Sequence, residues 1–175
     1  MQGSGESQRT IIVDASVLIN FLKIGRLDLL KRLPGYGFRI PEEVYREVSD
    51  VSQRRVLDLA LQEGWIEQIS FSEIEELRAY DQYRRQMDAG EAACLAVAVC
   101  RRWILACDES RKKRVYREVQ EKLGAGHLLN TPGVLVKLIQ AGLLDVQEAD
   151  LIKEELARNR FRMTFSSFQD LLDKE

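Results

Sequence analysis

The chain has 175 residues, of which 45% are hydrophobic and 31% are charged, and its net charge is −2. This composition supports a globular core and excludes both wholesale disorder and a uniformly basic nucleic-acid wrapper, while a local basic patch stays open. The longest apolar run, residues 92–100, is too short to cross a bilayer, so no membrane association is expected. The three cysteines form no close pair and there is one histidine, which argues against a disulfide scaffold or a zinc site and favours a reducing cytoplasm.

Short apolar runs alternate with helical patterns along the chain. Residues 1–9 are polar, so we expect a disordered start or a remnant of cloning, followed by a single domain over residues 10–175. Strands are predicted at residues 11–13, 38–40, 65–71, 103–107 and 127–129. Helices are predicted at residues 15–22, 27–33, 41–48, 53–62, 72–85, 91–102, 109–122, 131–141, 145–158 and 166–173.

Strands that are separated by helices imply a parallel sheet with helices on both of its faces. We therefore predict an α/β protein of three layers, α/β/α, with a short, mainly parallel central sheet and a helical C-terminal tail. Ser72 and Glu75 have the spacing of a helix capping box. The cysteines lie in apolar contexts and are expected to be small buried residues.

Two acidic residues stand where predicted strands end. Asp14 directly follows the strand at residues 11–13, and Asp108 directly follows the strand at residues 103–107. Because ligands in an open parallel sheet collect beyond the carboxyl ends of the strands, both side chains are predicted to reach one edge of the sheet. The alternative is that each aspartate only caps the helix that follows it.

Two further acids extend this set. Glu91 lies in the first turn of its helix, and Glu47 lies one helical turn beyond Glu43, with a solvated surface acid as the alternative for Glu47. The spacing alone does not separate Glu43 from Glu47. Four acids that converge on one cleft would repel unless a cation lies among them. Oxygen donors without a His or Cys cluster favour Mg²⁺ or Mn²⁺, which suits phosphodiester hydrolysis.

The order of these motifs resembles the PIN-domain family of metal-dependent ribonucleases, which includes the VapC-like toxins. The main motifs are I-I-V-D-A-S-V-L-I at 11–19, I-P-E-E-V-Y-R-E-V at 40–48, D-A-G-E-A-A-C-L-A-V-A at 88–98 and I-L-A-C-D-E-S-R-K-K-R-V at 104–115. The stretches N-T-P-G-V-L at 130–135 and R-F-R-M-T-F at 160–165 are similar to one branch of the family. The resemblance implies that the catalytic, metal-binding residues are Asp14, Glu47, Glu91 and Asp108, with auxiliary roles for Ser16, Asp88 and Glu109.

The resemblance also implies an activity. It is that of a Mg²⁺- or Mn²⁺-dependent endoribonuclease that hydrolyses RNA and leaves 5′-phosphate and 3′-hydroxyl ends. The family context suggests the toxin of a toxin–antitoxin pair, with a small antitoxin protein as partner and a homodimer as assembly. Two alternatives stay open: an RNA-processing or DNA nuclease without an antitoxin, and a catalytically degenerate PIN fold that binds nucleic acid or protein.

A basic segment surrounds the last of the four acids. Residues 101–117 contain seven basic side chains, which together with Asp108 and Glu109 leave a local net charge of +5. Positive charge beside a proposed acidic metal site is what a phosphate backbone requires. The predicted RNA contacts are Arg111, Lys113, Arg114 and Arg117, and the alternative is a solvated helical face.

Overall fold

The computed structural model describes residues 8–108 and 114–173. Five strands form one parallel sheet in the order β3-β2-β1-β4-β5. The order confirms the predicted parallel arrangement and places the first strand at its centre. The strands are β1 (Arg9–Val13), β2 (Tyr36–Pro41), β3 (Ile66–Ile69), β4 (Ile104–Ala106) and β5 (Leu128–Leu129).

The helices between the strands follow the predicted alternation. Within the described residues they are α1 (Ala15–Lys23), α2 (Asp28–Arg32), α3 (Glu42–Glu47), α4 (Val51–Gln62), α5 (Ile74–Arg84), α6 (Ala89–Arg101), α7 (Arg114–Lys122), the 3₁₀ helix η1 (Ala125–His127), α8 (Thr131–Gln140), α9 (Val146–Arg158) and α10 (Gln169–Leu172). No helix in this part of the chain is both long enough and apolar enough to span a membrane.

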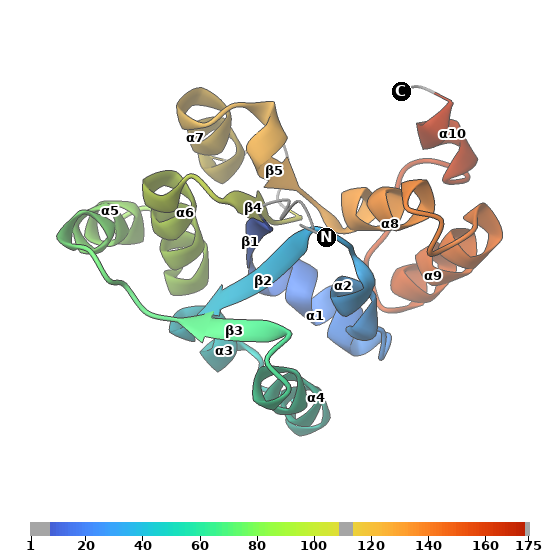
Figure 1. Ribbon diagram of the computed structural model, residues 1–175, viewed down its shortest axis with the longest axis horizontal. Helices are drawn as coiled ribbons and strands as arrows, with labels where there is room; N and C mark the ends of the chain where they lie inside the picture. The colour runs from blue at the N-terminus through green and yellow to red at the C-terminus, as the bar shows by residue number, and fades with distance from the viewer. Residues whose placement is uncertain (1–7, 109–113, 174–175) are drawn as a thin grey trace, which may run out of the picture.

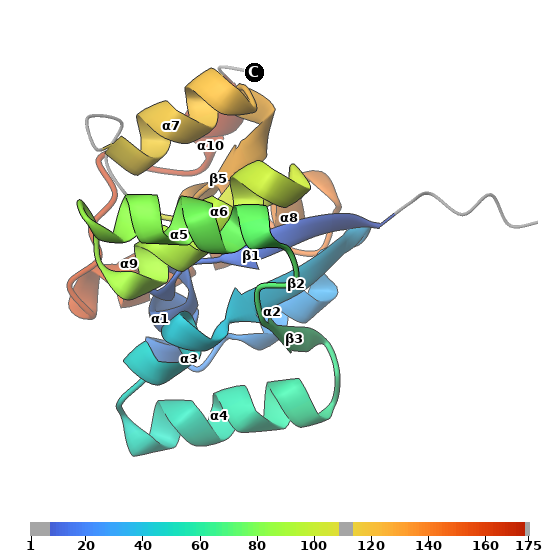
Figure 2. The ribbon, with the colours of Figure 1, turned by 90° about the vertical axis from the view of Figure 1, so that its left-hand side faces the viewer.

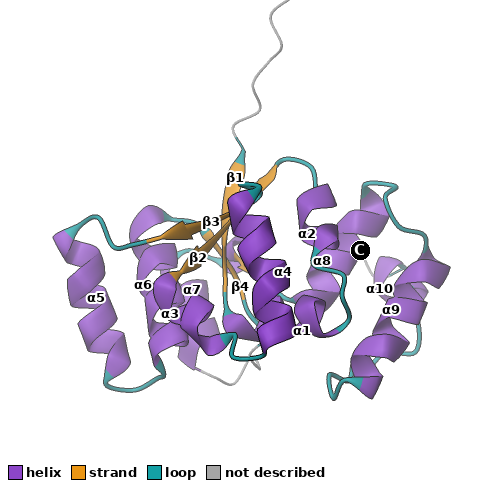
Figure 3. Ribbon diagram, turned by 90° about the horizontal axis from the view of Figure 1, so that it is seen from below, coloured by secondary structure: helices purple, strands orange, loops and turns teal. Residues whose placement is uncertain are grey.

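The helices divide between the two faces of the sheet, as predicted. Helices α5, α6 and α7 cover one face, and α1, α2 and α8 cover the other, with α9 and α10 outside α8 (Figures 1 and 3). Figure 2 shows the α5–α7 layer from its outer side. The three-layer α/β/α architecture and the helical C-terminal tail are therefore confirmed.

The central strand of the sheet is buried from solvent, in keeping with its apolar, β-branched sequence. Ile11, Ile12 and Val13 of β1 are fully buried, as expected for a parallel strand with helices on both faces. Helix α6 packs against the sheet through small side chains, since Ala92, Ala93, Ala96 and Ala98 are all buried. This packing fixes the N-terminal turn of α6 relative to the ends of β1 and β2.

Three local predictions need correction. Strand β1 begins at Arg9, which is paired with Tyr36, one residue before the expected start of the domain. The Ser72–Glu75 capping box is wrong, because the box is formed by Glu73 and Glu76. Cys94 and Cys107 are buried as expected, whereas Cys100 is exposed because it lies on the outer side of the last turn of α6.

Glu76, rather than Glu75, takes part in the capping box because it also forms an ion pair with Arg101. Its carboxylate is almost fully buried and accepts hydrogen bonds from Arg101 Nε at 2.5 Å and Nη2 at 3.0 Å. The same carboxylate accepts the Ser72 backbone N–H at 2.8 Å, which holds Ser72 just outside the helix. The ion pair therefore ties the start of α5 to the end of α6.

Candidate active site

Asp14 lies at the carboxyl end of the central strand β1, as predicted, and is only 5% exposed. Its Oδ2 accepts hydrogen bonds from the Ser16 backbone N–H at 3.1 Å and from Ser16 Oγ at 2.5 Å, so the side chain caps helix α1. Burial raises the pKa of Asp14, and the charge of Asp88 raises it further, although the Ser16 hydrogen bonds act against both. Asp14 therefore caps α1, and capping leaves its carboxylate at the sheet edge.

Asp108 follows β4 and is held by residues from two other elements. Its Oδ2 accepts hydrogen bonds from Asn20 Nδ2 at 2.9 Å and from Thr131 Oγ1 at 2.6 Å, and its Oδ1 accepts the Thr131 backbone N–H at 2.8 Å. Asn20 belongs to α1 and Thr131 opens α8, and both are buried. Burial raises the pKa of the Asp108 carboxyl, partly offset by these hydrogen bonds.

Ser16 joins the two aspartates. Its hydroxyl donates to Asp14 and accepts the backbone N–H of Asp108 at 3.1 Å. The charge of Asp14 contributes to the raised pKa of Asp108, which shows that the two carboxylates lie within electrostatic range. The ends of β1 and β4 thus bring together two of the four predicted acids, as their positions after neighbouring parallel strands require.

Glu47 reaches the same edge of the sheet from the end of α3. Burial raises the pKa of its carboxyl, and the charges of Asp88 and Asp14 raise it further, whereas a hydrogen bond from the Gly90 backbone lowers it. A Cβ atom at position 90 would collide with Glu47 Oε1. Glycine at this position is therefore what allows Glu47 to lie against the first turn of α6.

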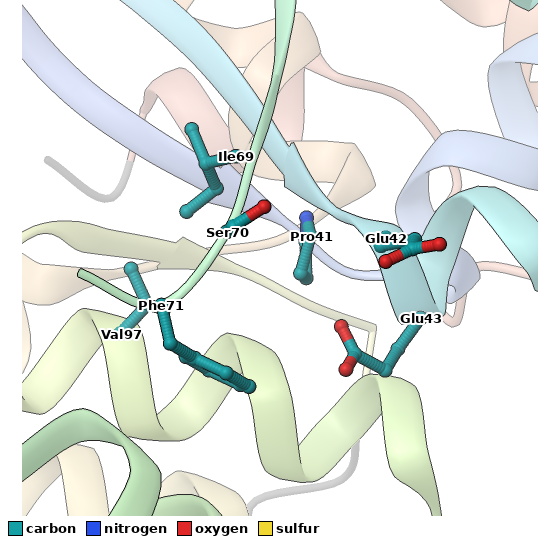
Figure 4. A pocket seen from close by; sticks show the side chains of 7 residues that line it. All are labelled: Pro41, Glu42, Glu43, Ile69, Ser70, Phe71 and Val97. Atoms are coloured by element: carbon teal, nitrogen blue, oxygen red, sulfur yellow. The ribbon is translucent and has the colours of Figure 1, made fainter. Parts of the chain in front are cut away.

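Glu43, one turn earlier on α3, occupies a different place. It lines a small cavity of about 60 Å³ together with Pro41, Phe71 and Val97. Figure 4 shows its side chain directed toward helix α6 and Phe71. Val97 lies two turns along α6 from Gly90, so the two glutamates meet different parts of that helix. The structure thus separates two residues that sequence spacing left equivalent.

The first turn of α6 carries the remaining predicted acids. Asp88 caps the helix, because its Oδ1 accepts the Glu91 backbone N–H at 2.9 Å. Glu91 is half-buried and directly follows Gly90. Asp88 also raises the pKa of both Asp14 and Glu47. Asp88 therefore caps α6 and also lies close enough to Asp14 and Glu47 to affect their pKa.

The chemistry of this donor set fits a hard divalent cation. The groups near this edge are carboxylates, with no imidazole or thiolate among the proposed donors, and the charge of Asp14 raises the pKa of both Glu47 and Asp108. Within residues 8–108 and 114–173, however, no three His, Cys, Asp or Glu side chains are grouped closely enough to hold a metal ion. The donors therefore fit in kind, and a bound cation would need to draw them together.

The basic segment is only partly described. Arg111 and Lys113, as well as the auxiliary candidate Glu109, lie outside the described residues. Arg114 forms an ion pair with Glu118 at 3.5 Å, whereas Arg117 is exposed on α7. Of the predicted phosphate contacts in the described chain, Arg117 is thus the one without an ion-pair partner among these residues.

Three residues around the acids were missed by the sequence interpretation. Asn20 and Thr131 hold Asp108, and Gly90 accommodates Glu47. Asn20 is a polar residue inside an otherwise apolar helical run, and Thr131 is the first residue of α8, two positions after β5. Both signals indicate a buried polar partner, but neither tells which acid it contacts.

Comparison with known proteins agrees with this geometry. The model of a family described as PIN domain matches residues 10–174, which is nearly the whole chain. Among curated proteins, none matches the chain significantly. The parallel sheet, the helical layers on both of its faces and the extent of the family match lead to one conclusion: the chain belongs to the PIN-domain family.

Proposed function

We propose that this protein is a Mg²⁺- or Mn²⁺-dependent endoribonuclease. PIN domains are generally nucleases, so a nucleic acid is the expected substrate class. In this proposal Asp14, Glu47, Glu91 and Asp108 hold the metal, and RNA is the strand that is cut. The observation that carries it is the link from Asp14 through Ser16 to Asp108 at the end of two neighbouring strands, with Glu47 electrostatically coupled to Asp14.

The protein's own residues supply orientation. Ser16 holds Asp14 and the backbone of Asp108 in a fixed relation, and Asn20 with Thr131 directs both oxygens of Asp108. Gly90 lets the Glu47 side chain lie against the first turn of α6. When bound, a divalent ion activates water and stabilises the charge that develops on the phosphate. In this proposal Arg117, which is exposed on helix α7, binds the RNA backbone.

The wider role is also a proposal. We assign the protein to the toxin side of a toxin–antitoxin pair, with a small antitoxin partner and a homodimeric assembly. Exposed apolar side chains gather on α4, where Val51, Val56 and Leu59 are 67%, 43% and 55% exposed, and they support burial against a protein partner. The three free cysteines support a reducing, cytoplasmic location.

The direct test measures cleavage of end-labelled single-stranded RNA by the purified protein with Mg²⁺, with Mn²⁺ and with EDTA. Cleavage should require the metal, and Asp14→Asn should reduce it by at least about a hundredfold, because a metal ion contributes several kcal/mol to transition-state stabilisation. Asn retains an oxygen that can cap α1, so the variant should stay folded, which circular dichroism checks. Metal-dependent cleavage by Asp14→Asn at the parent's rate would contradict the assignment.

A second function is favoured by one observation. Since no three-acid group in the described residues is closed enough to hold a metal, the fold also suits a module that binds RNA without cutting it. Tight RNA binding by the parent, together with no cleavage in either metal, would support this role. Cleavage of single-stranded DNA in preference to RNA would instead indicate a DNA nuclease.

A further inference from the structure

A groove with a volume of about 860 Å³ lies between helix α8 and residues 161–165. We call it the C-terminal groove. Pro132, Val136 and Lys137 line it from α8, Phe161 and Arg162 line it from the facing segment, and Asp108 is also part of its wall. The groove is therefore continuous with the candidate active site through Asp108. Most of its lining comes from residues that have no role in the proposed metal site.

The outer wall of the C-terminal groove is held at both ends. At its start, the Phe161 backbone N–H donates to the Leu156 carbonyl at 2.9 Å. Beyond its end, Asp150 accepts hydrogen bonds from Ser167 Oγ at 2.6 Å and from the Phe168 backbone at 2.9 Å, and the Phe168 side chain is fully buried. The wall is thus preformed, which lowers the entropy that a ligand must overcome on binding.

The wall presents apolar and polar groups in alternation, and Arg162 is the cation among residues 161–165. Phe161, Met163 and Phe165 are half-buried, whereas Arg162 is exposed. The Phe165 ring is already engaged by Phe168, at a centroid distance of 4.9 Å, and by Lys153 Nζ at 5.7 Å. Phe161 has no aromatic or cation–π contact, and Arg162 no acidic partner, within the described chain. These two side chains are available to a ligand.

We propose that the C-terminal groove binds an unstacked base of single-stranded RNA, with Phe161 stacking on the base and Arg162 binding an adjacent phosphate. The inference rests on the proposed function, because it places the strand beside Asp108. Pockets of about 300–1,000 Å³ take one small organic ligand, so this groove has room for about one or two nucleotides. Bases inside a duplex are already stacked and paired, so a duplex does not offer them to such a site.

Charge decides between RNA and an apolar peptide as the occupant. The groove combines aromatic and aliphatic surface with Lys137 and Arg162, and a nucleic-acid strand offers base faces that stack on aromatic rings next to charged phosphates. A purely apolar helix would leave Arg162 without a partner, whereas Lys137 already lies over the Tyr36 ring at 5.5 Å. The observations therefore favour RNA, and a peptide occupant becomes an outcome of the test.

The test measures binding of a short fluorescein-labelled single-stranded RNA by anisotropy, in the Asp14→Asn background so that cleavage does not interfere. Phe161→Leu should weaken binding about five- to tenfold, since base–aromatic stacking has this strength, and Phe161→Tyr should restore it. Arg162→Gln should weaken binding and flatten the dependence of log affinity on log salt by about 0.7. Arg160→Gln is the matched control, because Arg160 is exposed in the same motif but does not line the groove.

A second measurement locates the strand directly. RNA that contains 4-thiouridine, cross-linked to the same protein, should label residues 161–165 or α8, and a label confined to other elements would overturn the proposal. Unchanged RNA binding in both Phe161→Leu and Arg162→Gln, with folding verified by circular dichroism, would also overturn it and leave the groove to a peptide. Loss of RNA binding in these variants, in a parent that never cleaves RNA, would support the groove and contradict only the nuclease assignment.

Discussion

The candidate site has two halves that are built differently. At the strand half, Asp14 and Asp108 are held by hydrogen bonds from Ser16, Asn20 and Thr131. At the helix half, Glu47 is an exposed residue at the end of a short helix, its carboxyl group is partly buried, and a hydrogen bond from the Gly90 backbone stabilises the charged form. The first half is rigid and built into the core, whereas the second is adjustable.

This difference indicates how such a site can exist without its cation. Burying four unpaired carboxylates in one fixed position would be costly, because each charge disfavours the ionised form of the others. Holding two of them by hydrogen bonds and leaving the other two at helix ends reduces that repulsion. The absence of a closed three-acid group among the described residues is consistent with this division. Variants in each half should therefore fail in different ways.

The largest expected effect is on catalysis at the helix half. Glu47→Gln should lower metal-dependent RNA cleavage by about a hundredfold or more, because it removes a charged ligand without removing a buried contact. Glu43→Gln is the matched control, since Glu43 lines a separate small cavity. Rates measured at saturating Mg²⁺ decide the matter. Loss of activity in Glu43→Gln alone would move the ligand one turn along α3.

The next effect is on folding at the strand half. Asp108→Asn should lower the free energy of unfolding by about 1–3 kcal/mol, because both Asp108 oxygens accept hydrogen bonds and an amide NH₂ would face a donor. Asp14→Asn should not, since its Oδ2 is the atom that accepts both Ser16 hydrogen bonds and Asn supplies one such oxygen. Urea unfolding in EDTA compares the two. Equal free energies of unfolding for the two variants would contradict the claim that Asp108 contributes more to folding than Asp14.

A third variant acts between the halves. Gly90→Ala should displace the Glu47 carboxylate and reduce cleavage by about tenfold, comparable to the loss of a group that orients a metal ligand. Its thermal stability should be equal or slightly higher, because the obstructing atom ends a flexible side chain and Ala favours helix more than Gly. Activity and melting temperature should therefore change independently. A large fall in melting temperature would mean that the Glu47 side chain cannot move away from the added methyl group.

The smallest expected effect is the pH dependence of stability. The pKa of Asp14 is raised in the folded protein by burial, so its contribution to stability is fully present below its ordinary value of 3.8 and is lost as pH rises through the folded value. In EDTA, Asp14→Asn should therefore match the parent near pH 3.8 and become relatively more stable toward pH 7. Denaturant titrations at several pH values measure this difference. Mg²⁺ should stabilise the parent more than the variant.

The sequence predicted the strand half better than the helix half, and the reason is geometric. Parallel strands end at a common edge, so acids that directly follow β1 and β4 must meet there. No comparable rule places the end of α3 against the start of α6. The choice of Glu47 over Glu43 came only from the family resemblance, and the structure adds the contact with Gly90 that spacing could not show.

Other differences arise from tertiary partners that local patterns do not contain. The capping box moved from Ser72–Glu75 to Glu73–Glu76 because Arg101, far along the chain, pairs with Glu76. The partners of Asp108 come from α1 and α8, which are distant in sequence. The parallel sheet and its helical layers, by contrast, follow from the alternation of strand and helix patterns, whereas the strand order was not predicted.

Because of the close approach at Gly90, substitutions at positions 47 and 90 depend on each other. A larger residue at position 90 is compatible with a carboxylate at position 47 only if that carboxylate withdraws, and aspartate, one methylene shorter, does so. Selection for restored activity starting from Gly90→Ala should therefore return Glu47→Asp as a suppressor. The same reasoning applies to relatives of this chain, in which alanine at this helix position should occur together with the shorter acid.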